Sequence, residues 1–488
     1  MTPDSLMILA TAIPLGGAIL IGLSGRWPNL REAITLTTAL ALFACVAALV
    51  PDVLAGARPK LEIVTIMPGL LLSFALEPLG MLFAIVASFL WIMNSIYSIG
   101  YMRGNRESNQ TRFYVYFAVA LSSTMGVALS GNLLTLFIFY ELLTLSTYPL
   151  VTHKGTDEAI RGGRTYLGLL LTTSIGFFLL AILWTWNLTG TLEFTPGGIL
   201  AGHVNDTMVG LLLFLYVFGI GKAALMPLHR WLPAAMVAPT PVSALLHAVA
   251  VVKAGVFAVV KVIVYIFGID FLRVIESDWL LYIAGATILI ASLIALRQDN
   301  LKLRLAYSTV SQLSYVILAA AILAPLSIVG AALHIAVHAF GKITLFFAAG
   351  SIYTASHKIR VSELDGIGRR MPWTMGAFAV GALSMIGVPP TAGFVSKWYI
   401  LLAAMETANM FAVAVLIGST LLTAAYYLPI VYAAFFRSPA KAGHATAHGE
   451  APLSVVLATV ATAILTILLF WFPGLPLQLA DGLTGGKP

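Results

Sequence analysis

The sequence contains little charge. Only 10% of its 488 residues are Asp, Glu, Lys or Arg, whereas soluble domains carry roughly 25%. Hydrophobic residues make up 60% of the chain, and the mean hydropathy is +0.96. A soluble fold of this size cannot bury that much apolar surface, so the composition excludes a soluble globular protein and predicts an all-α polytopic membrane protein.

Cysteine is nearly absent as well. Cys45 is the single cysteine, which excludes an intrachain disulfide, a CxxC motif and an iron–sulfur ligand set within this chain. No polar stretch between the hydrophobic runs is long enough for a soluble catalytic domain, and we expect no cofactor and no bound metal. The first hydrophobic run lacks a basic start and is followed by many others, so we expect a retained helix and not a cleaved signal.

The sequence is rich in hydrophobic runs. At roughly 20 residues per spanning helix, its hydrophobic content allows about fourteen transmembrane helices. Short polar segments divide the chain into fourteen hydrophobic runs, near residues 5–24, 33–51, 79–101, 112–130, 133–152, 165–187, 207–227, 243–268, 279–296, 305–324, 326–350, 373–404, 411–436 and 453–472. Between the second and third runs, LEIVTIMPGLLLSFALEPLG alternates and contains Pro68-Gly69, which predicts a short hairpin at the outer surface. We expect His444 and His448, in a polar Ala/Gly-rich loop, to be solvated.

Basic residues are distributed unevenly over the connections. Eighteen of the 27 Lys and Arg residues lie in the connections 1–2, 3–4, 5–6 and so on, against four in the opposite connections and the termini. Cytoplasmic loops carry the excess of Lys and Arg, so we predict a multi-pass protein of the bacterial inner membrane with both termini on the periplasmic side. The net charge of +7 is therefore a topology signal, and we expect no nucleic-acid partner.

Nine titratable residues fall at membrane depth. A charge at the bilayer centre costs at least roughly 2.5 kcal/mol, so such residues usually face an internal cavity and serve ion or proton movement. Snorkelling to the surface or structural hydrogen bonding is the alternative for each of them. The nine residues are Glu141, Lys222, His247, Lys253, Lys261, His334, His338, Lys342 and Lys397.

Glu141 and Lys222 are expected to form an ion pair. Glu141 lies midway along its run with no polar neighbour within one turn except Thr144, so it must be protonated or paired across helices. Lys222 lies in GIGKAALMP, whose glycines and proline break the helix at membrane depth. Such a pair would act as a switch, because burial favours proton release from Lys222 once the carboxylate moves away.

A second broken run carries Lys397, in MIGVPPTAGFVSKWYI. The broken runs are the seventh and the twelfth, which predicts two inverted five-helix repeats, helices 4–8 and 9–13. The predicted organisation is helices 1–3 (residues 1–111), the first repeat (112–268), the second repeat (269–436), and a loop with the last helix (437–488).

The eighth run contains His247 and Lys253, with Lys253 near its middle. Lys261 lies one to two turns further out, where we expect it to snorkel or to support packing. A lysine that is neutral at pH 7 needs a large shift of its pKa, and burial near the middle of the run can supply that shift for Lys253.

His334, His338 and Lys342 follow one another at four-residue spacing in the eleventh run, so they share one helix face. A histidine pair at this spacing can bind a metal, but no cysteine or carboxylate lies nearby as a third ligand, and we predict no metal site. From inside to outside, the protonatable series is Lys222, Lys253, the His334/His338 face and Lys397. Imidazoles titrate near neutrality and adjacent protonatable groups pass protons, so the series predicts a proton relay.

Five segments resemble a known family. FYELLTLSTYPLV, GIGKAALMPLHRWLPAAMVAPTPVSALLHAVAVVKAGVF, LAYSTVSQLSYVILA, HAFGKITLFFAAG and GVPPTAGFVSKWYILL look like the antiporter-like proton-translocating membrane subunits. That family includes large membrane subunits of Mrp-type cation/proton antiporters, of respiratory complex I and of membrane-bound hydrogenases. The resemblance covers residues 75–435 and implies fourteen helices, two inverted repeats and broken helices seven and twelve.

The resemblance also implies residue roles. Glu141 matches the fifth-helix glutamate that couples to the seventh-helix lysine, here Lys222. Lys253 matches the relay lysine of the eighth helix, with His247 one step along the same helix.

On the outer side, His338 matches the eleventh-helix histidine. Lys397 matches the terminal lysine of the twelfth helix, a position that is a glutamate in some members.

The parent complex stays open between two readings. LLHAVAVVKAGVF looks most similar to the D subunit of Mrp antiporters and its hydrogenase counterparts, which favours a Na⁺ or K⁺/proton antiporter with other membrane subunits as partners. The alternative is a redox-driven complex I or hydrogenase, whose redox centres would lie in partner subunits because this chain has no ligands for them. In either case we expect an ion-transport subunit without redox or hydrolytic chemistry of its own. A scaffold without a proton path is a third class, which the intact series argues against.

Overall fold

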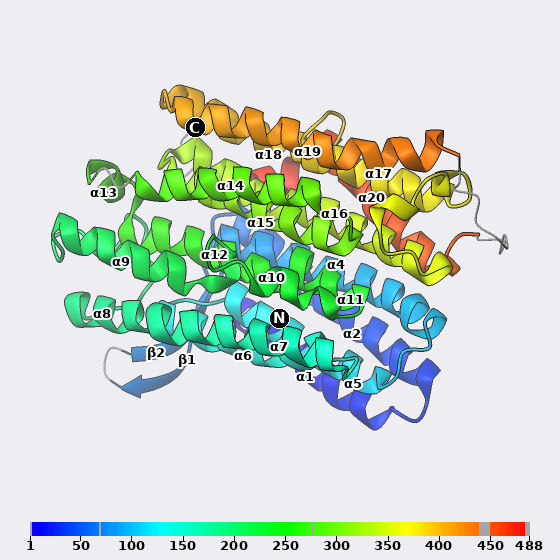
Figure 1. Ribbon diagram of the computed structural model, residues 1–488. Helices are drawn as coiled ribbons and strands as arrows, with labels where there is room; N and C mark the ends of the chain where they lie inside the picture. The colour runs from blue at the N-terminus through cyan, green and yellow to red at the C-terminus, as the bar shows by residue number, and fades with distance from the viewer. Residues whose placement is uncertain (1, 68–69, 276–277, 439–448, 484–488) are drawn as a thin grey trace.

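The computed structural model describes residues 2–67, 70–275, 278–438 and 449–483. It is a bundle of long helices that run back and forth along one direction (Figure 1). The α-helices of the first half are α1 (Pro3–Leu23), α2 (Pro28–Ala47), α3 (Val50–Leu54), α4 (Pro78–Gly104), α5 (Gln110–Ala128), α6 (Leu133–Val151), α7 (Asp157–Thr173), α8 (Leu179–Thr189), α9 (Asp206–Gly219), α10 (Trp231–Ala234), α11 (Thr240–Ala244) and α12 (Val251–Lys261). Those of the second half are α13 (Ile269–Val274), α14 (Trp279–Arg297), α15 (Leu301–Ala321), α16 (Pro325–Ser356), α17 (Pro372–Ile386), α18 (Ala392–Glu406), α19 (Met410–Phe436), α20 (Leu453–Trp471) and α21 (Gly474–Asp481).

The expected all-α membrane architecture is confirmed. Among the described residues, ten helical segments are long and apolar enough to cross a membrane. The other four predicted runs contain α5, α9, α15 and the pair α17–α18. α9 and α17 are shorter apolar helices, because each ends at a break. The count of fourteen stays a prediction, as does the division into domains.

Both predicted breaks are present. α9 ends at Gly219, and a 3₁₀ turn, Gly221–Ala223, follows it. α17 ends at Ile386, and the next residue, Gly387, has a φ of +88°, a left-handed conformation that glycine adopts without strain. α18 then begins at Ala392. The glycines and prolines therefore stop each helix at its predicted place.

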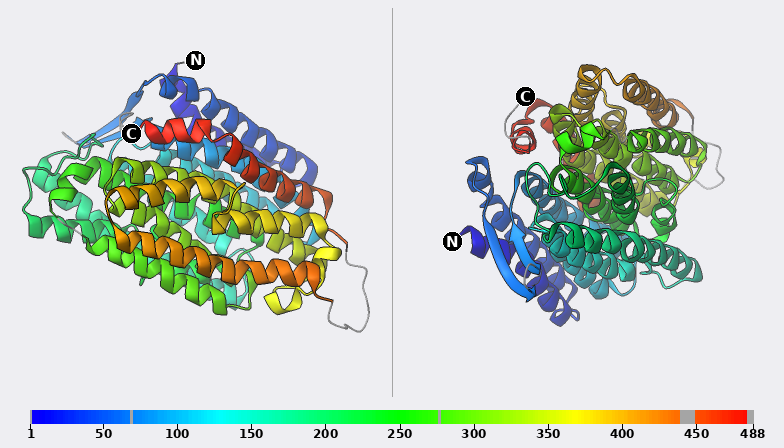
Figure 2. Two further views of the ribbon diagram at one scale, coloured as in Figure 1. Left: turned by 90° about the horizontal axis from the view of Figure 1, so that it is seen from above. Right: turned by 90° about the vertical axis from the view of Figure 1, so that its left-hand side faces the viewer.

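The predicted hairpin is also present. β1 (Lys60–Met67) pairs antiparallel with β2 (Leu70–Ala75), while Pro68 and Gly69 lie outside the described residues. β2 continues into contact with the chain before α6, where the Gly131 amide donates to Ser73 O at 2.9 Å. Figure 2 shows the hairpin beside the N-terminal helices at one end of the bundle. The loop histidines His444 and His448 also fall outside the described part of the chain.

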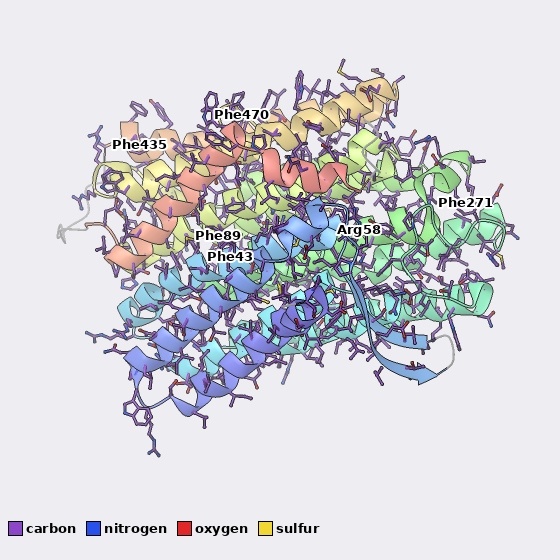
Figure 3. All side chains as sticks on the ribbon, turned by 180° about the vertical axis from the view of Figure 1, so that it is seen from behind. Phe43, Arg58, Phe89, Phe271, Phe435 and Phe470 are labelled. Carbon is purple, nitrogen blue, oxygen red and sulfur yellow. The ribbon has the colours of Figure 1, made fainter. Side chains whose placement is uncertain are left out.

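Two helical segments form the centre. The continuous segment Thr240–Phe267, which contains α11 and α12, is buried throughout, and the long helix α16 is buried from Ser327 to Ile352. Peripheral helices cover them; for example, Phe43 of α2 packs edge-on against Phe89 of α4, with ring centroids 5.5 Å apart (Figure 3). Phe271 and Phe435 mark the two ends of the bundle in Figure 3. Most of the titratable residues that were predicted at membrane depth therefore lie on segments that other helices shield from lipid.

Candidate proton path

Lys222 occupies the break after α9. Its Nζ donates to the main-chain oxygen of Tyr140 at 2.7 Å and to Thr144 Oγ1 at 2.5 Å, both on α6. The ammonium also lies over the Tyr140 ring, 3.1 Å from the centroid. The expected ion pair with Glu141 is therefore wrong for this conformation. In this conformation the ammonium contacts a carbonyl oxygen, a hydroxyl oxygen and the Tyr140 ring, and not the carboxylate.

Glu141 has no hydrogen-bond partner. Both of its carboxylate oxygens are buried and unpaired. The next residue on α6, Leu142, is 46% exposed, and Leu145 is 52% exposed, so the carboxyl group lies just beneath an apolar outer face. Burying a carboxyl group without a hydrogen-bond partner is costly, so Glu141 is a poorly satisfied polar group next to the first break.

The two buried central segments meet at Lys253 and His338. Lys253 Nζ of α12 lies 2.7 Å from His338 Nδ1 of α16, and neither residue is accessible to solvent. α12 reaches this place because Gly255 packs directly on the main chain of Lys222, where a Cβ atom would collide. The break after α9 is thereby brought next to the part of α12 that carries Lys253.

His247 is not joined to this pair. Its ring packs against Phe346 with centroids 4.9 Å apart, and both ring nitrogens are buried without a partner. The residue lies in the predicted helical segment, Thr240–Phe267, but the structure gives it no hydrogen bond to Lys253.

His334 and Lys397 meet at Tyr315. The His334 ring stacks on the Tyr315 ring with centroids 5.5 Å apart, and Lys397 Nζ lies 4.7 Å from the Tyr315 centroid. His334 Nδ1 is 2.9 Å from Ser396 Oγ, the residue before Lys397. Lys397 donates to the main-chain oxygens of Met385 and Ile386 at the end of α17. The second break thus holds its lysine with carbonyl oxygens, as the first one does.

Two further lysines are part of the interior. Lys342 Nζ donates to Ser308 Oγ at 2.9 Å and to the Tyr427 hydroxyl at 3.3 Å. Lys261 is 1% exposed, so snorkelling is wrong for it; its Nζ lies 3.1 Å from Glu77 Oε1 and donates to a main-chain oxygen. Lys261 therefore supports packing through a buried ion pair.

Comparison with known proteins identifies the family of this chain. The profile of the family described as NADH:quinone oxidoreductase/Mrp antiporter, TM, matches residues 130–423. The chain belongs to this family. NADH-quinone oxidoreductase subunit N of Desulforudis audaxviator is 32% identical over 457 residues, covering 92% of this chain and 89% of that protein. NAD(P)H-quinone oxidoreductase subunit 5 of the Ipomoea purpurea chloroplast is 33% identical, and the chain spans 52% of its length.

Solved structures of the same fold come from two kinds of complex. A chain of the Mrp complex from Dietzia sp. DQ12-45-1b superposes with a TM-score of 0.89, at 23% identity, covering 100% of this chain and 98% of that one. A chain of the membrane-bound sulfane sulfur reductase, an archaeal respiratory membrane complex, superposes with a TM-score of 0.86, at 24% identity, covering 98% and 97%. This member of the family is thus an antiporter-like, multi-pass membrane subunit.

Several polar residues of the site were not predicted from the sequence. Tyr140, Ser396, Tyr315 and Ser308 contact the lysines and histidines directly. The segment LAYSTVSQLSYVILA contained a usable signal, because its polar residues recur at the spacing of one helix face. Within the described ranges, no group of three or more His, Cys, Asp or Glu residues is placed to hold a metal ion.

An open cleft of about 590 Å³ lies at the end of the bundle where α7 and α15 begin and α16 ends. Lys154, Glu158 and Lys302 are among its lining residues, together with Thr240 at the start of α11. Lys302 Nζ donates to the main-chain oxygens of Met236 and Ala238, which fastens the linker before α11. The cleft therefore borders the segment that leads to the buried centre.

Proposed function

We propose that the chain is the proton-translocating subunit of a multisubunit monovalent cation (Na⁺ or K⁺)/proton antiporter, with other membrane subunits as partners. The hydrogen bond between Lys253 and His338 carries this proposal. It joins a lysine and an imidazole at 2.7 Å inside the two most buried segments, and a separation of about 2.6–3.2 Å is the distance of direct proton transfer. A pair of charges that only held helices together would use groups of opposite sign.

In this proposal the subunit lies in a bacterial inner membrane with both termini on the periplasmic side. The cleft beside Lys302 would then open to the cytoplasm, since it is lined by residues of the positively charged connections. Protons would enter there and leave near Lys397. The excess of basic residues in alternate connections supports this orientation.

The pair Glu141 and Lys222 would control the path. When Glu141 is charged, it favours the protonated form of Lys222. When Glu141 is neutral, burial favours release of the proton from Lys222 toward Lys253, whose helix packs on the Lys222 main chain. The observed contacts of Lys222 with α6 correspond to the state in which the two side chains are apart.

The second candidate is the same path in a redox-driven complex. The 32% identity with NADH-quinone oxidoreductase subunit N, over 92% of this chain, favours it. Partner subunits would then supply the redox energy, while the buried lysines and histidines would keep their roles.

Proton movement tests the path itself. The purified complex is placed in vesicles with a pH-sensitive dye, and wild type is compared with Lys222→Ala and Lys397→Ala. We expect both variants to stop proton movement. Intact movement in either variant would assign the chain to the scaffold class.

Purification tests the parent complex. The tagged chain is isolated from its native membrane under mild conditions, and co-purifying subunits and iron are measured on one sample. Small membrane subunits without iron, together with Na⁺- or K⁺-dependent proton movement, support the antiporter. Stoichiometric iron with soluble redox subunits supports the second candidate.

A further inference from the structure

The open cleft at the end of the bundle has a strongly basic lining. A partly enclosed space lined by charges of one sign focuses their field and attracts ions of the opposite sign. Among the described residues, the charged side chains of the lining are four cations and one carboxylate: Lys154, Arg161, Lys302, Lys358 and Glu158. The lining therefore carries a formal net charge of +3.

Two of the four cations have no partner of opposite charge. In the described part of the chain, the Arg161 guanidinium makes no hydrogen bond and no ion pair. Lys154 Nζ lies 5.9 Å from the centroid of the Tyr353 ring and makes no hydrogen bond either. Lys358 donates one hydrogen to the main-chain oxygen of Glu363 at 2.7 Å, which leaves two N–H groups of its ammonium. Charged donors are thus available in the cleft.

Lys302 adds a charge that is held in place. Its Nζ donates to the main-chain oxygens of Met236 and Ala238, which leaves one N–H group of the ammonium. Burial and the nearby Lys154 charge lower the pKa of Lys302 to about 7, while Glu107 opposes them. The two lysines are therefore close enough to repel each other, and an anion beside them would relieve this repulsion.

The start of α15 also faces the cleft. Its N-cap residue, Asn300, and its first residues up to Leu303 belong to the lining. The N-terminal end of a helix carries a partial positive charge that favours an anion. This contribution has the same sign as that of the four side chains.

The cleft lies at the level where spanning segments end. Thr165 of the lining is the first residue of the hydrophobic run 165–187, and Ala349 is next to the last residue of the run 326–350. Lipid headgroups lie at this level of a membrane. The volume of about 590 Å³ is typical of a site for a small molecule. Part of the lining is apolar: Pro233, Ala234, Val237, Leu303 and Ile359.

We propose that this cleft binds a phosphate group, with Arg161 and Lys154 as its principal ligands and with Lys302 and Lys358 as further donors. An anionic phospholipid headgroup and free phosphate share this chemistry. The level of the cleft and its apolar lining favour the lipid, because basic pockets between transmembrane helices recognise anionic headgroups. The inference concerns binding alone, so it does not rest on the proposed function.

A phosphate group fits the arrangement of the cations. They come from four parts of the chain: the connection before α7, α7 itself, the first turn of α15, and the connection after α16. A phosphate offers several oxygens to donors that approach from different sides, and the guanidinium of Arg161 can bind two of them at once. A carboxylate offers only two oxygens.

Lipid binding to the purified complex tests the site. The complex is freed of bound lipid in mild detergent, and fluorescent phosphatidylglycerol or phosphatidylcholine is added while anisotropy is measured. We expect tighter binding of phosphatidylglycerol, which weakens as salt is added. Equal affinity for the two lipids would overturn the proposal. Inorganic phosphate at millimolar concentration identifies the source: bound phosphatidylglycerol that it does not displace supports a lipid headgroup, and displacement supports free phosphate.

Variants place the binding in the cleft. Arg161→Gln and Lys154→Gln should each weaken the binding of phosphatidylglycerol by about fivefold, and the double variant should weaken it further. Neither side chain has a partner to lose, so we expect both variants to fold. The matched control is Arg164→Gln, one turn along α7, because Arg164 is exposed but does not line the cleft. Wild-type affinity in the double variant, or an equal loss in the control, would overturn the proposal.

A density map of the complex gives a second test. We expect density for a phosphate group within hydrogen-bond distance of Arg161 and Lys154. An acidic segment of a partner subunit in the cleft would overturn the proposal. Neither test measures proton movement, so the outcome for Lys222→Ala and Lys397→Ala leaves this inference unchanged.

Discussion

Replacing Lys253 by arginine separates the charge at this position from the transfer of a proton. Arginine keeps the positive charge and the donors that face His338, but it does not release a proton in proteins. Loss of a general acid–base group slows a proton-transfer step by about 10²–10⁴-fold. Each factor of ten corresponds to about 1.36 kcal/mol, so we expect a barrier higher by at least about 2.7 kcal/mol. The 2.7 Å contact makes this step direct, without an alternative partner for His338 Nδ1.

The assay is dye-detected proton movement in vesicles that contain the intact complex, with subunit composition checked for each preparation. Lys253→Met is made in parallel, and it should also lower stability by about 1–3 kcal/mol because His338 Nδ1 loses its partner. The matched control is Lys60→Arg, because the Lys60 side chain is 46% exposed on the hairpin. Wild-type rate in Lys253→Arg would show that the charge alone matters and would refute proton relay through Lys253.

Three further predictions concern stability. Gly255→Val should lower the thermal unfolding midpoint, at a cost of about 1–3 kcal/mol, because the new side chain collides with the 3₁₀ turn; an unchanged midpoint would contradict the close packing. Lys261→Met should destabilise by about 3–5 kcal/mol, since it leaves Glu77 without its partner, and adding Glu77→Gln should restore most of the loss; a double variant no more stable than the single one would count against a paired charge. Burial and Arg112 lower the pKa of His153 from 6.5 to about 4. The folded state therefore binds this proton less readily than the unfolded state, so stability is full above about pH 6.5 and falls as the pH drops toward 4. In His153→Phe the thermal unfolding midpoint should depend less on pH between about 6.5 and 4. The same dependence on pH as in wild type would refute the role of His153.

The fold was largely accessible from the sequence because the bilayer imposes simple rules. Apolar length predicted the spanning segments, and glycine and proline at membrane depth predicted both breaks. The hairpin followed from alternation next to Pro68-Gly69. In each case the signal is local in the chain, so no tertiary information was needed.

The contacts of the site were less accessible. Lys222 and Lys397 are held by main-chain oxygens, which every residue possesses and no sequence pattern marks. The ion pair of Lys261 was missed because Glu77 precedes a proline at the end of the hairpin, which looked like a surface position. The basic cleft was not visible either, because its cations come from separate parts of the chain that only the fold brings together.

The hydrogen bonds of Lys397 to main-chain oxygens also determine which substitutions the neighbouring positions tolerate. Its two acceptors are the carbonyl oxygens of Met385 and Ile386, so exchanging either side chain for another apolar one leaves both acceptors in place. Gly387 has no such freedom, because a Cβ there would meet the Lys397 side chain. A saturation library over these positions should therefore tolerate many residues at 385 and 386 and few at 387. Backbone geometry therefore anchors this lysine, and Gly387 is the position of the three at which a side chain is least tolerated.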